Sequence, residues 1–374
     1  MAQGFSLADQ IFNAESISDL AREYGAAIDG FDPDGFYAEV MDGLSGRGFM
    51  ERIEWIADCL ESRLSADFPE MADQLEAAMV APLDPSQKDD DFGRFIHAVP
   101  GVLALRHGLE AHLDRAMPLL YQATQRFSME FYIRAFINRW PDEVLPRLLQ
   151  WAGDENYHVR RLVSEGLRPK LPWAKKLNIA VDVPIPYLDK LHADETRFVT
   201  RSVANHLNDI AKTQPDLVIE TLKRWHAEGR QDQKELAWMT RHALRTLIKQ
   251  GHVDAMLMLG FRADAPVRLD RLALAKDQVK AGDALEIDVT LSADEKCPVV
   301  VDYQIWFQRK DGSQSFKVFK LKQAVVQPGK PLTMAKRHVL KGNATTFTLY
   351  EGVHRVAVQV NGRILGDIEF HLAL

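Results

Sequence analysis

The chain has 374 residues, of which 46% are hydrophobic and 26% charged, as in a soluble globular protein with material for two or three domains. No apolar run reaches the ~20 residues that a membrane-spanning helix needs, so no membrane association is expected. Two distant cysteines, Cys59 and Cys297, exclude a disulfide framework. With no signal-like segment at the start, they lead us to expect a cytoplasmic protein.

The formal net charge of −7 hides an asymmetry along the chain. Residues 1–91 hold 21 Asp and Glu against 5 Lys and Arg, whereas residues 92–374 hold 41 basic against 32 acidic side chains. A mildly basic later part hints at polyanion binding, which local clusters of cations would have to provide.

The first 80 residues predict short helices at 1–25, 36–64 and 70–80, with a glycine-rich break at 43–48. A polar loop follows from Pro82 to Asp91, and we interpret its acidic end, residues 89–91, as a solvated turn. From Phe95 to Gln250 helical periodicity dominates, and prolines mark helix starts or turns between helices.

A repeat organises this helical part. Residues 154–167 and 194–207 match at a shift of 40 residues, in an acidic pair, a stripe of apolar positions and one arginine. A third copy ends at Leu247. Such a repeat is typical of a HEAT-like array, whose helix pairs stack into a curved solenoid. The repeated arginines, Arg161, Arg201 and Arg241, would then line one side of the curve, where a ladder of cations suits DNA.

Near residue 260 the pattern changes to seven short alternating runs separated by polar turns. The runs are Val267–Ala275, Leu285–Leu291, Val299–Phe307, Phe316–Leu321, Leu332–Val339, Gly352–Val360 and Ile364–Leu372. Asn361-Gly362 between the last two is a strong hairpin signal. The predicted fold is mainly α: a HEAT-like α-helical solenoid at 1–262, followed by an all-β immunoglobulin-like sandwich at 263–374.

The segment 159–176 concentrates six cations around one acid, Glu165. Its first four cations are Arg160, Arg161, Arg168 and Lys170. The spacing alone favours reading Glu165 as a solvated partner of Arg161 or Arg168. In the next repeat Asn205 takes its place, so the repeat itself demands no carboxylate there.

Three further residues are candidates for a functional site. Glu130 interrupts an aromatic and apolar helix, and its alternative role is a salt bridge to Arg126 or Arg134. Asp209 is either a site acid or a polar residue near a helix end. Trp173, among lysines in a loop, either stacks on a sugar or base or packs between layers.

The sequence offers no support for several other kinds of site. The twelve histidines show no metal-ligand spacing, and no phosphate-binding glycine loop or nucleophile elbow is present. We therefore expect neither a metal nor a cofactor.

The chain resembles the HEAT-like-repeat alkylpurine DNA glycosylases, and among them the AlkC-type branch. The resemblance spans about residues 5–250 and rests on three motifs: Phe5-Ser-Leu-Ala-Asp-Gln-Ile-Phe-Asn13, His158-Val-Arg-Arg-Leu-Val-Ser-Glu-Gly-Leu-Arg-Pro-Lys-Leu-Pro-Trp173 and Arg201-Ser-Val-Ala-Asn-His-Leu-Asn-Asp209. Some members of this branch carry a C-terminal immunoglobulin-like domain, in agreement with the strand-rich end.

The resemblance implies a monomeric repair enzyme that excises N3-methyladenine and N3-methylcytosine from double-stranded DNA without flipping the base. Glu130, Glu165 and Asp209 would face the damaged nucleotide. The cation ladder and the motifs together give the expected DNA contacts: Arg160, Arg161, Arg168, Lys170, Trp173, Arg201, Asn205 and Arg241.

The residues agree with this chemistry. An N3-methylated base is a cationic leaving group, so the enzyme must stabilise charge developing on the sugar and orient a water. Acids within a basic wall suit that task, whereas acids would repel DNA in a mere binder. In the β-domain the basic group around Arg309 and Lys310 either extends the DNA contact or is ordinary surface charge.

Two alternatives remain open at this stage. The first is a DNA-structure binder without catalytic activity, and the second is a protein-interaction scaffold, a common use of helical arrays. Salt-sensitive retention on DNA would separate a phosphate binder from a scaffold.

Overall fold

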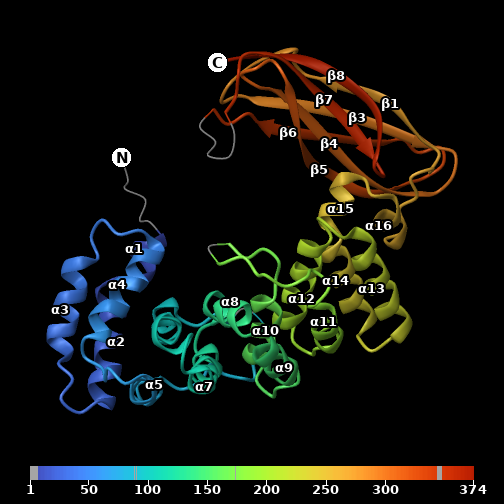
Figure 1. Ribbon diagram of the computed structural model, residues 1–374. Helices are drawn as coiled ribbons and strands as arrows, with labels where there is room; N and C mark the ends of the chain where they lie inside the picture. Colours follow the sequence, from blue (N-terminus) through green and yellow to red (C-terminus); the bar gives the residue numbers. More distant parts are fainter. Residues whose placement is uncertain (1–6, 88, 90, 173, 343–347) are drawn as a thin grey trace. The chain divides into compact units, whose positions relative to one another are not determined.

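The computed structural model describes residues 7–87, 89, 91–172, 174–342 and 348–374 (Figure 1). The opening residues 1–6 and Trp173, both parts of the quoted motifs, therefore lie outside the described residues. The chain packs as two compact units, residues 1–243 and 244–374. A helical part followed by a strand-rich part is the order that the sequence predicts.

The first unit begins with five helices: α1 (Leu7–Ile11), α2 (Ala14–Ala27), α3 (Pro33–Gly43), α4 (Phe49–Glu61) and α5 (Phe68–Ala77). Side-chain caps start three of them, because the carboxylate or amide oxygens of Asn13, Asp32 and Asp67 accept free backbone N–H groups of the first turn. The predicted break at 43–48 is confirmed between α3 and α4.

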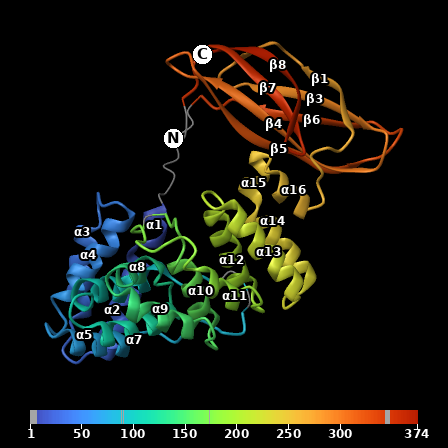
Figure 2. The ribbon, with the colours of Figure 1, turned by 45° about the vertical axis from the view of Figure 1, so that its right-hand side comes forward.

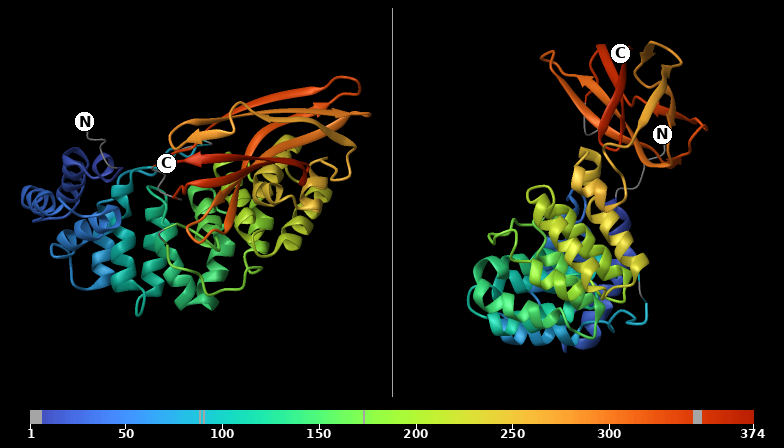
Figure 3. Two further views of the ribbon diagram at one scale, coloured as in Figure 1. Left: turned by 90° about the horizontal axis from the view of Figure 1, so that it is seen from above. Right: turned by 90° about the vertical axis from the view of Figure 1, so that its right-hand side faces the viewer.

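A longer helical series completes this unit. It comprises a 3₁₀ turn (Phe95–Ala98), α6 (Val99–Leu103), a π turn (Ala104–Gly108), α7 (Leu113–Thr124), α8 (Glu130–Arg139), α9 (Pro141–Trp151), α10 (Tyr157–Gly166), α11 (Ile185–Leu191), α12 (Arg197–Ile210), α13 (Pro215–Glu228) and α14 (Gln233–Ala243). Helices α8, α10, α12 and α14 pack side by side in one row (Figures 1 and 3). Helices α9, α11 and α13 alternate with them in sequence and pack against them.

The repeat explains this row. The apolar positions of its first two copies are all buried: Val159, Val163, Leu167, Val199, Val203 and Leu207. The repeated arginines fall on α10, α12 and α14, one in each successive helix. The predicted helical repeat is thus confirmed, and its row of helices carries most of the candidate site residues.

The described residues of the second unit form eight strands: β1 (Val267–Leu274), β2 (Gln278–Lys280), β3 (Ala284–Ala293), β4 (Cys297–Gln308), β5 (Gln314–Val326), β6 (Leu332–Val339), β7 (Gly352–Val360) and β8 (Arg363–Ala373). They form one sheet in the order β1-β3-β6 and another in the order β2-β8-β7-β4-β5. Alternating side chains of both sheets, such as Ile287 of β3 and Val301 of β4, share one buried core.

The predicted hairpin at residues 361–362 is confirmed, since Asn361 and Gly362 adopt φ of 46° and 81° between β7 and β8. The sequence predicted seven strands, and the one it missed is β2, whose three residues pair in parallel with β8. A run this short has no alternation that periodicity could detect.

Two helices, α15 (Arg245–Gln250) and α16 (Val253–Met258), pack with the strands of the second unit (Figure 2). Met256 and Phe261 form a small buried cluster with Val300 of β4. The Asn361 side chain donates a hydrogen bond to the Arg262 carbonyl oxygen at 2.9 Å. The boundary between the two compact units therefore lies before these helices, between residues 243 and 244, whereas the sequence analysis places the domain boundary at 262/263.

Candidate active site

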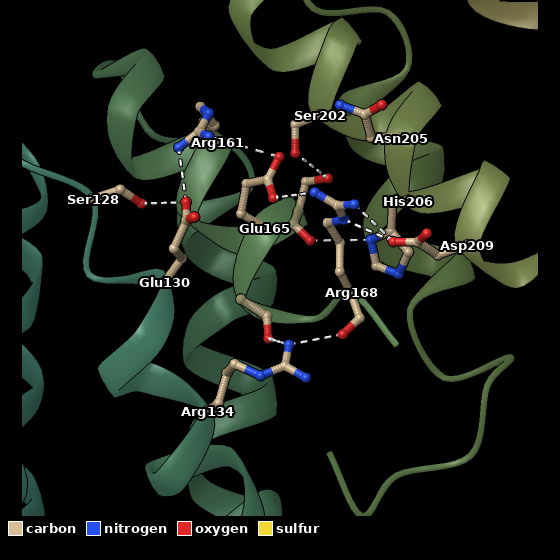
Figure 4. A network of polar contacts seen from close by, with 12 residues as sticks. Ser128, Glu130, Arg134, Arg161, Glu165, Arg168, Ser202, Asn205, His206 and Asp209 are labelled. Atoms are coloured by element: carbon tan, nitrogen blue, oxygen red, sulfur yellow. Dashed lines mark hydrogen bonds and ion pairs between the residues drawn. The ribbon is translucent and has the colours of Figure 1, made fainter. Parts of the chain in front are cut away.

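Glu130 is the first residue of α8, where the positive end of the helix dipole favours a carboxylate. One carboxylate oxygen accepts hydrogen bonds from the Ser128 hydroxyl at 2.8 Å and from Nη1 of Arg161 at 3.0 Å (Figure 4). Arg126 and Arg134, the partners that the sequence offered, donate to backbone carbonyl oxygens instead. The acid of α8 is thus tied to the repeat arginine of α10.

Glu165 lies in the last turn of α10 and is 3% exposed. Nη1 of Arg168 lies 2.8 Å from one of its oxygens, and Nη2 of Arg161 lies 3.7 Å from the other. The pairing expected from the spacing is confirmed, but the pair is buried and not solvated. Arg161 therefore connects Glu165 with Glu130.

Asp209, in the last turn of α12, completes the network from the other side. Nε and Nη2 of Arg168 donate to one of its oxygens at 3.0 and 2.8 Å, and Lys212 donates to the other at 2.7 Å. Asp209 does not line the cavity onto which Glu130 and Glu165 open. Its contacts place it behind Arg168, where it orients that guanidinium.

The pKa values of the two acids at the cavity are shifted in opposite directions. Burial raises the pKa of Glu130, helped by the nearby charge of Glu165, and Arg161 only partly offsets it. Burial also opposes the ionisation of Glu165, but the guanidinium groups of Arg161 and Arg168 outweigh it and hold the pKa of this carboxyl below its usual value. Opposed shifts in neighbouring carboxyls are a common sign of divided chemical roles.

A cavity of about 300 Å³ opens onto these acids. It is lined by Phe92, Glu130, Phe131, Arg161, Glu165, Arg168, Leu171, Pro172, Phe198, Arg201, Ser202 and Asn205. Carboxylates and aromatic rings together suit a flat, positively charged ligand. The Arg161 guanidinium is itself held over the Phe198 ring, 4.5 Å from its centroid.

His206 of α12 lies beneath the network and is fully buried. Burial lowers the pKa of His206 to about 3, so the ring is neutral at physiological pH. Nδ1–H donates a hydrogen bond to the Ser164 carbonyl oxygen at 3.0 Å. This histidine therefore adds no charge to the site.

The other predicted DNA contacts divide into two groups. Arg201 and Asn205 line the cavity, and Arg201 forms an ion pair with Asp89, a residue of the segment that the sequence reads as a solvated turn. Arg160 instead pairs with Asp194, 2.5 Å away, and is 13% exposed.

Lys170 and Arg241 are exposed but do not line the cavity. Trp173 lies outside the described residues.

Sequence reasoning missed the aromatic wall of the cavity. Phe198 lies in the repeat at the place of His158, and an apolar residue on a repeat helix predicts only core. Phe92 follows the acidic run 89–91, yet its ring meets Phe198 edge-on at 5.0 Å. The only signal in the sequence was the position of Phe92, an aromatic residue directly after a polar loop.

Within the described ranges, no group of three or more His, Cys, Asp and Glu side chains is arranged to hold a metal ion. Over the same ranges, none of the helices combines the length and apolarity needed to cross a membrane.

Comparison with known proteins agrees with this geometry. Residues 126–247 match a family described as DNA alkylation repair enzyme, and residues 268–374 match the C-terminal immunoglobulin-like domain of the uncharacterised protein YhaZ. The Bacillus subtilis (strain 168) protein YhaZ, itself uncharacterised, is 32% identical over 270 residues, which cover 71% of this chain and 74% of the relative.

The structure is also similar to that of the alkylpurine DNA glycosylase AlkC of Pseudomonas fluorescens bound to DNA containing an abasic site analog. The TM-score is 0.86 at 32% identity, over 98% of this chain and 99% of the other. These matches confirm the resemblance found in the sequence. The chain therefore belongs to the AlkC-type family of DNA alkylation repair proteins, with a helical-repeat part and a C-terminal immunoglobulin-like domain.

Proposed function

We propose that this protein is a DNA glycosylase that excises cationic N3-methylated bases, N3-methyladenine and N3-methylcytosine, from double-stranded DNA. The observation that carries the proposal is the pair of buried carboxylates, Glu130 and Glu165, at one cavity whose rim is basic. A phosphate-binding surface gains nothing from buried acids, whereas a site for a cationic base and a cationic transition state does.

The reaction needs no acid to protonate the leaving group. As the glycosidic bond breaks, its electron pair neutralises the positive charge of the methylated base, and positive charge develops on the sugar. Water attacks the anomeric carbon and gives up one proton, which leaves a free neutral base and an abasic site. The protein has to stabilise the sugar charge, hold the water and accept that proton.

The opposed pKa shifts suggest how the two acids divide this work. Glu165 is held in its ionised form, so it suits electrostatic stabilisation of the sugar cation. Glu130, whose pKa is raised, is the better proton acceptor, and we assign it to orienting and deprotonating the water. Asp209 acts through Arg168, which it holds against Glu165.

The arginines supply the other half of the site. Arg161 and Arg201 lie on successive helices of the row and line the cavity, where phosphates beside the lesion would lie. The Pseudomonas fluorescens relative holds DNA in its solved structure, which supports the same partner here. We expect the base to remain in the duplex during excision, and 2-aminopurine beside the lesion would report unstacking by a rise in fluorescence.

The test is product analysis with wild-type protein and duplex DNA containing N3-methyladenine or N3-methylcytosine. Free base and an abasic site in equal amounts are expected, with no release from undamaged DNA. Binding to DNA without release would instead support the DNA-structure binder, and neither binding nor release would support the interaction scaffold. Salt-dependent retention on the same DNA measures binding independently.

A further inference from the structure

Helix α8 presents three side chains at a spacing of four residues, Glu130, Arg134 and Asn138, which places them along one face of the helix. The first belongs to the candidate site. The other two contact the segment that follows α10, from Gly166 to Asn178. Their contacts are with backbone atoms, so they act on the course of the segment itself.

Arg134 binds three carbonyl oxygens of this segment. Nη1 donates to Gly166 at 3.0 Å and to Arg168 at 2.7 Å (Figure 4). Nε donates to Lys175 at 2.6 Å. One side chain thus joins the end of α10 to a point nine residues further on. A planar guanidinium fork presents donors from separate nitrogen atoms, as this arrangement uses, whereas lysine presents all its donors from one nitrogen.

Asn138 closes the far end. Its amide nitrogen donates to the Lys176 carbonyl oxygen at 2.8 Å, and its amide oxygen accepts from the Asn178 backbone nitrogen at 2.8 Å. This pair of hydrogen bonds resembles the pairing of two strands in a β-sheet, with the Asn138 side chain in place of one strand.

The burial of Arg134 indicates that this anchorage has a purpose. The side chain is fully buried, and burial lowers the pKa of Arg134 to about 10. The ion pairs found among the described residues include none to Arg134, and its Nη2 has no hydrogen-bond partner there. A guanidinium buried on carbonyl oxygens alone is costly, and an apolar side chain would avoid that cost.

The anchored segment carries functional side chains but no regular structure of its own. Apart from Gly166, the last residue of α10, its described residues form neither helix nor strand before α11. They include Arg168, which joins Glu165 to Asp209, and Leu171 and Pro172, which line the cavity. Without outside contacts such a segment would sample many conformations.

We propose that Arg134 and Asn138 are positioning residues for base excision. Helix α8 holds Glu130 directly and holds Arg168 through Arg134, so one rigid element sets both groups relative to Glu165. This inference rests on the proposed function and adds how the site is kept assembled. Arg134 governs the part of the segment from Arg168 to Lys175, and Asn138 governs its end at Lys176 and Asn178.

The test compares Arg134→Lys and Asn138→Ala in the full chain with Arg52→Lys. Arg52 is the control, since it is also buried and also donates to backbone carbonyl oxygens, those of Phe12 and Arg47. It lies on α4 and, unlike Arg134, also forms an ion pair with Asp9. Steady-state base release from N3-methyladenine duplex, which gives kcat and KM, is measured from pH 5 to 8, together with hydrogen exchange of segment 166–178.

In Arg134→Lys, Arg168 is held less well, so Glu165 loses part of the charge that keeps it ionised. We expect kcat to fall about tenfold at neutral pH, the effect of losing one hydrogen bond to a charged group. Toward pH 5 the rate should also fall more steeply than in the wild type, because Glu165 then takes up a proton at a higher pH in addition to Glu130. In Asn138→Ala we expect a larger KM at nearly unchanged kcat. Hydrogen exchange of the segment should rise in both variants but not in Arg52→Lys.

An unchanged exchange rate of the segment in both variants would overturn the inference, whatever the activity. So would a rate profile of Arg134→Lys parallel to that of the wild type, since a loss of folded protein lowers all rates alike. If the wild type releases no base, the proposed function fails, and the exchange data still decide whether the anchorage exists.

Discussion

Replacing Arg161 by methionine removes the cation that lies between the two acids of the cavity. All three side chains are largely buried, with exposures of 13% for Arg161, 14% for Glu130 and 4% for Glu165. Glu165 keeps Arg168 at 2.8 Å, but the hydroxyl of Ser128 is the remaining partner of Glu130 within the described residues. Most of the cost of the substitution therefore falls on Glu130.

We expect the variant to lose about 3 kcal/mol of unfolding free energy at pH 7.5, because removing one partner leaves a buried charge uncompensated. The loss should depend on pH. In the folded state the pKa of Glu130 is already raised, and it rises further without Arg161. Above pH 4.5 the folded state then binds a proton that the unfolded state has released, so stability falls as pH increases toward the folded pKa.

The assay is urea unfolding followed by far-UV circular dichroism at pH 5 and pH 7.5. The double variant Arg161→Met/Glu130→Gln is the internal control, since it removes the stranded charge, and it should regain at least about 1 kcal/mol at pH 7.5. A loss of equal size at both pH values, with no recovery in the double variant, would refute the electrostatic reasoning.

Three further substitutions give distinct results. In His206→Gln the fall in unfolding free energy between pH 6.5 and 5.5 should be smaller than in the wild type by about 1 kcal/mol. In the wild type, burial holds the folded pKa of His206 at about 3, so the unfolded chain takes up the proton first in this range. Urea unfolding at both pH values measures this difference, and equal slopes for variant and wild type would contradict the reasoning. Arg160→Met should lower stability, since it breaks the ion pair with Asp194, but leave the salt dependence of DNA binding unchanged. Arg201→Met should reduce the slope of log affinity against log salt by about 0.9, the value for one phosphate contact. Fluorescence anisotropy of labelled DNA at several salt concentrations measures the slope for both arginine variants. A reduced slope in Arg160→Met and an unchanged slope in Arg201→Met would contradict the assignment.

The sequence predicted the parts of the structure that local patterns encode. The 40-residue repeat located the row of helices, because each copy must bury the same apolar stripe against its neighbours. Alternation and the Asn361-Gly362 turn located the β-domain. The motif around Glu165 located one acid of the candidate site together with the two arginines that it contacts.

What the sequence could not give was the pairing between distant elements. Glu130 meets Arg161 and Arg168 meets Asp209 across 31 and 41 residues. Spacing within one helix points Glu130 to the wrong partners, Arg126 or Arg134. The burial of Glu165 could not be predicted from the sequence either. It changes the expected surface ion pair of Glu165 into a buried one, in which the pKa of Glu165 is shifted. Arg134 also looked like an ordinary helix cation, although it anchors a loop.

The measurement that tests the account most directly is the single-turnover rate of base release from a duplex with one N3-methyladenine, for wild type, Glu165→Gln and Glu143→Gln. Glu143 is an exposed acid of α9 and serves as the matched control. We predict a loss of about 10²–10³-fold in Glu165→Gln, the size found when one preorganised electrostatic contact is removed, and no change in Glu143→Gln. Equal rates for all three proteins would contradict the claim that the buried carboxylate of Glu165 drives excision.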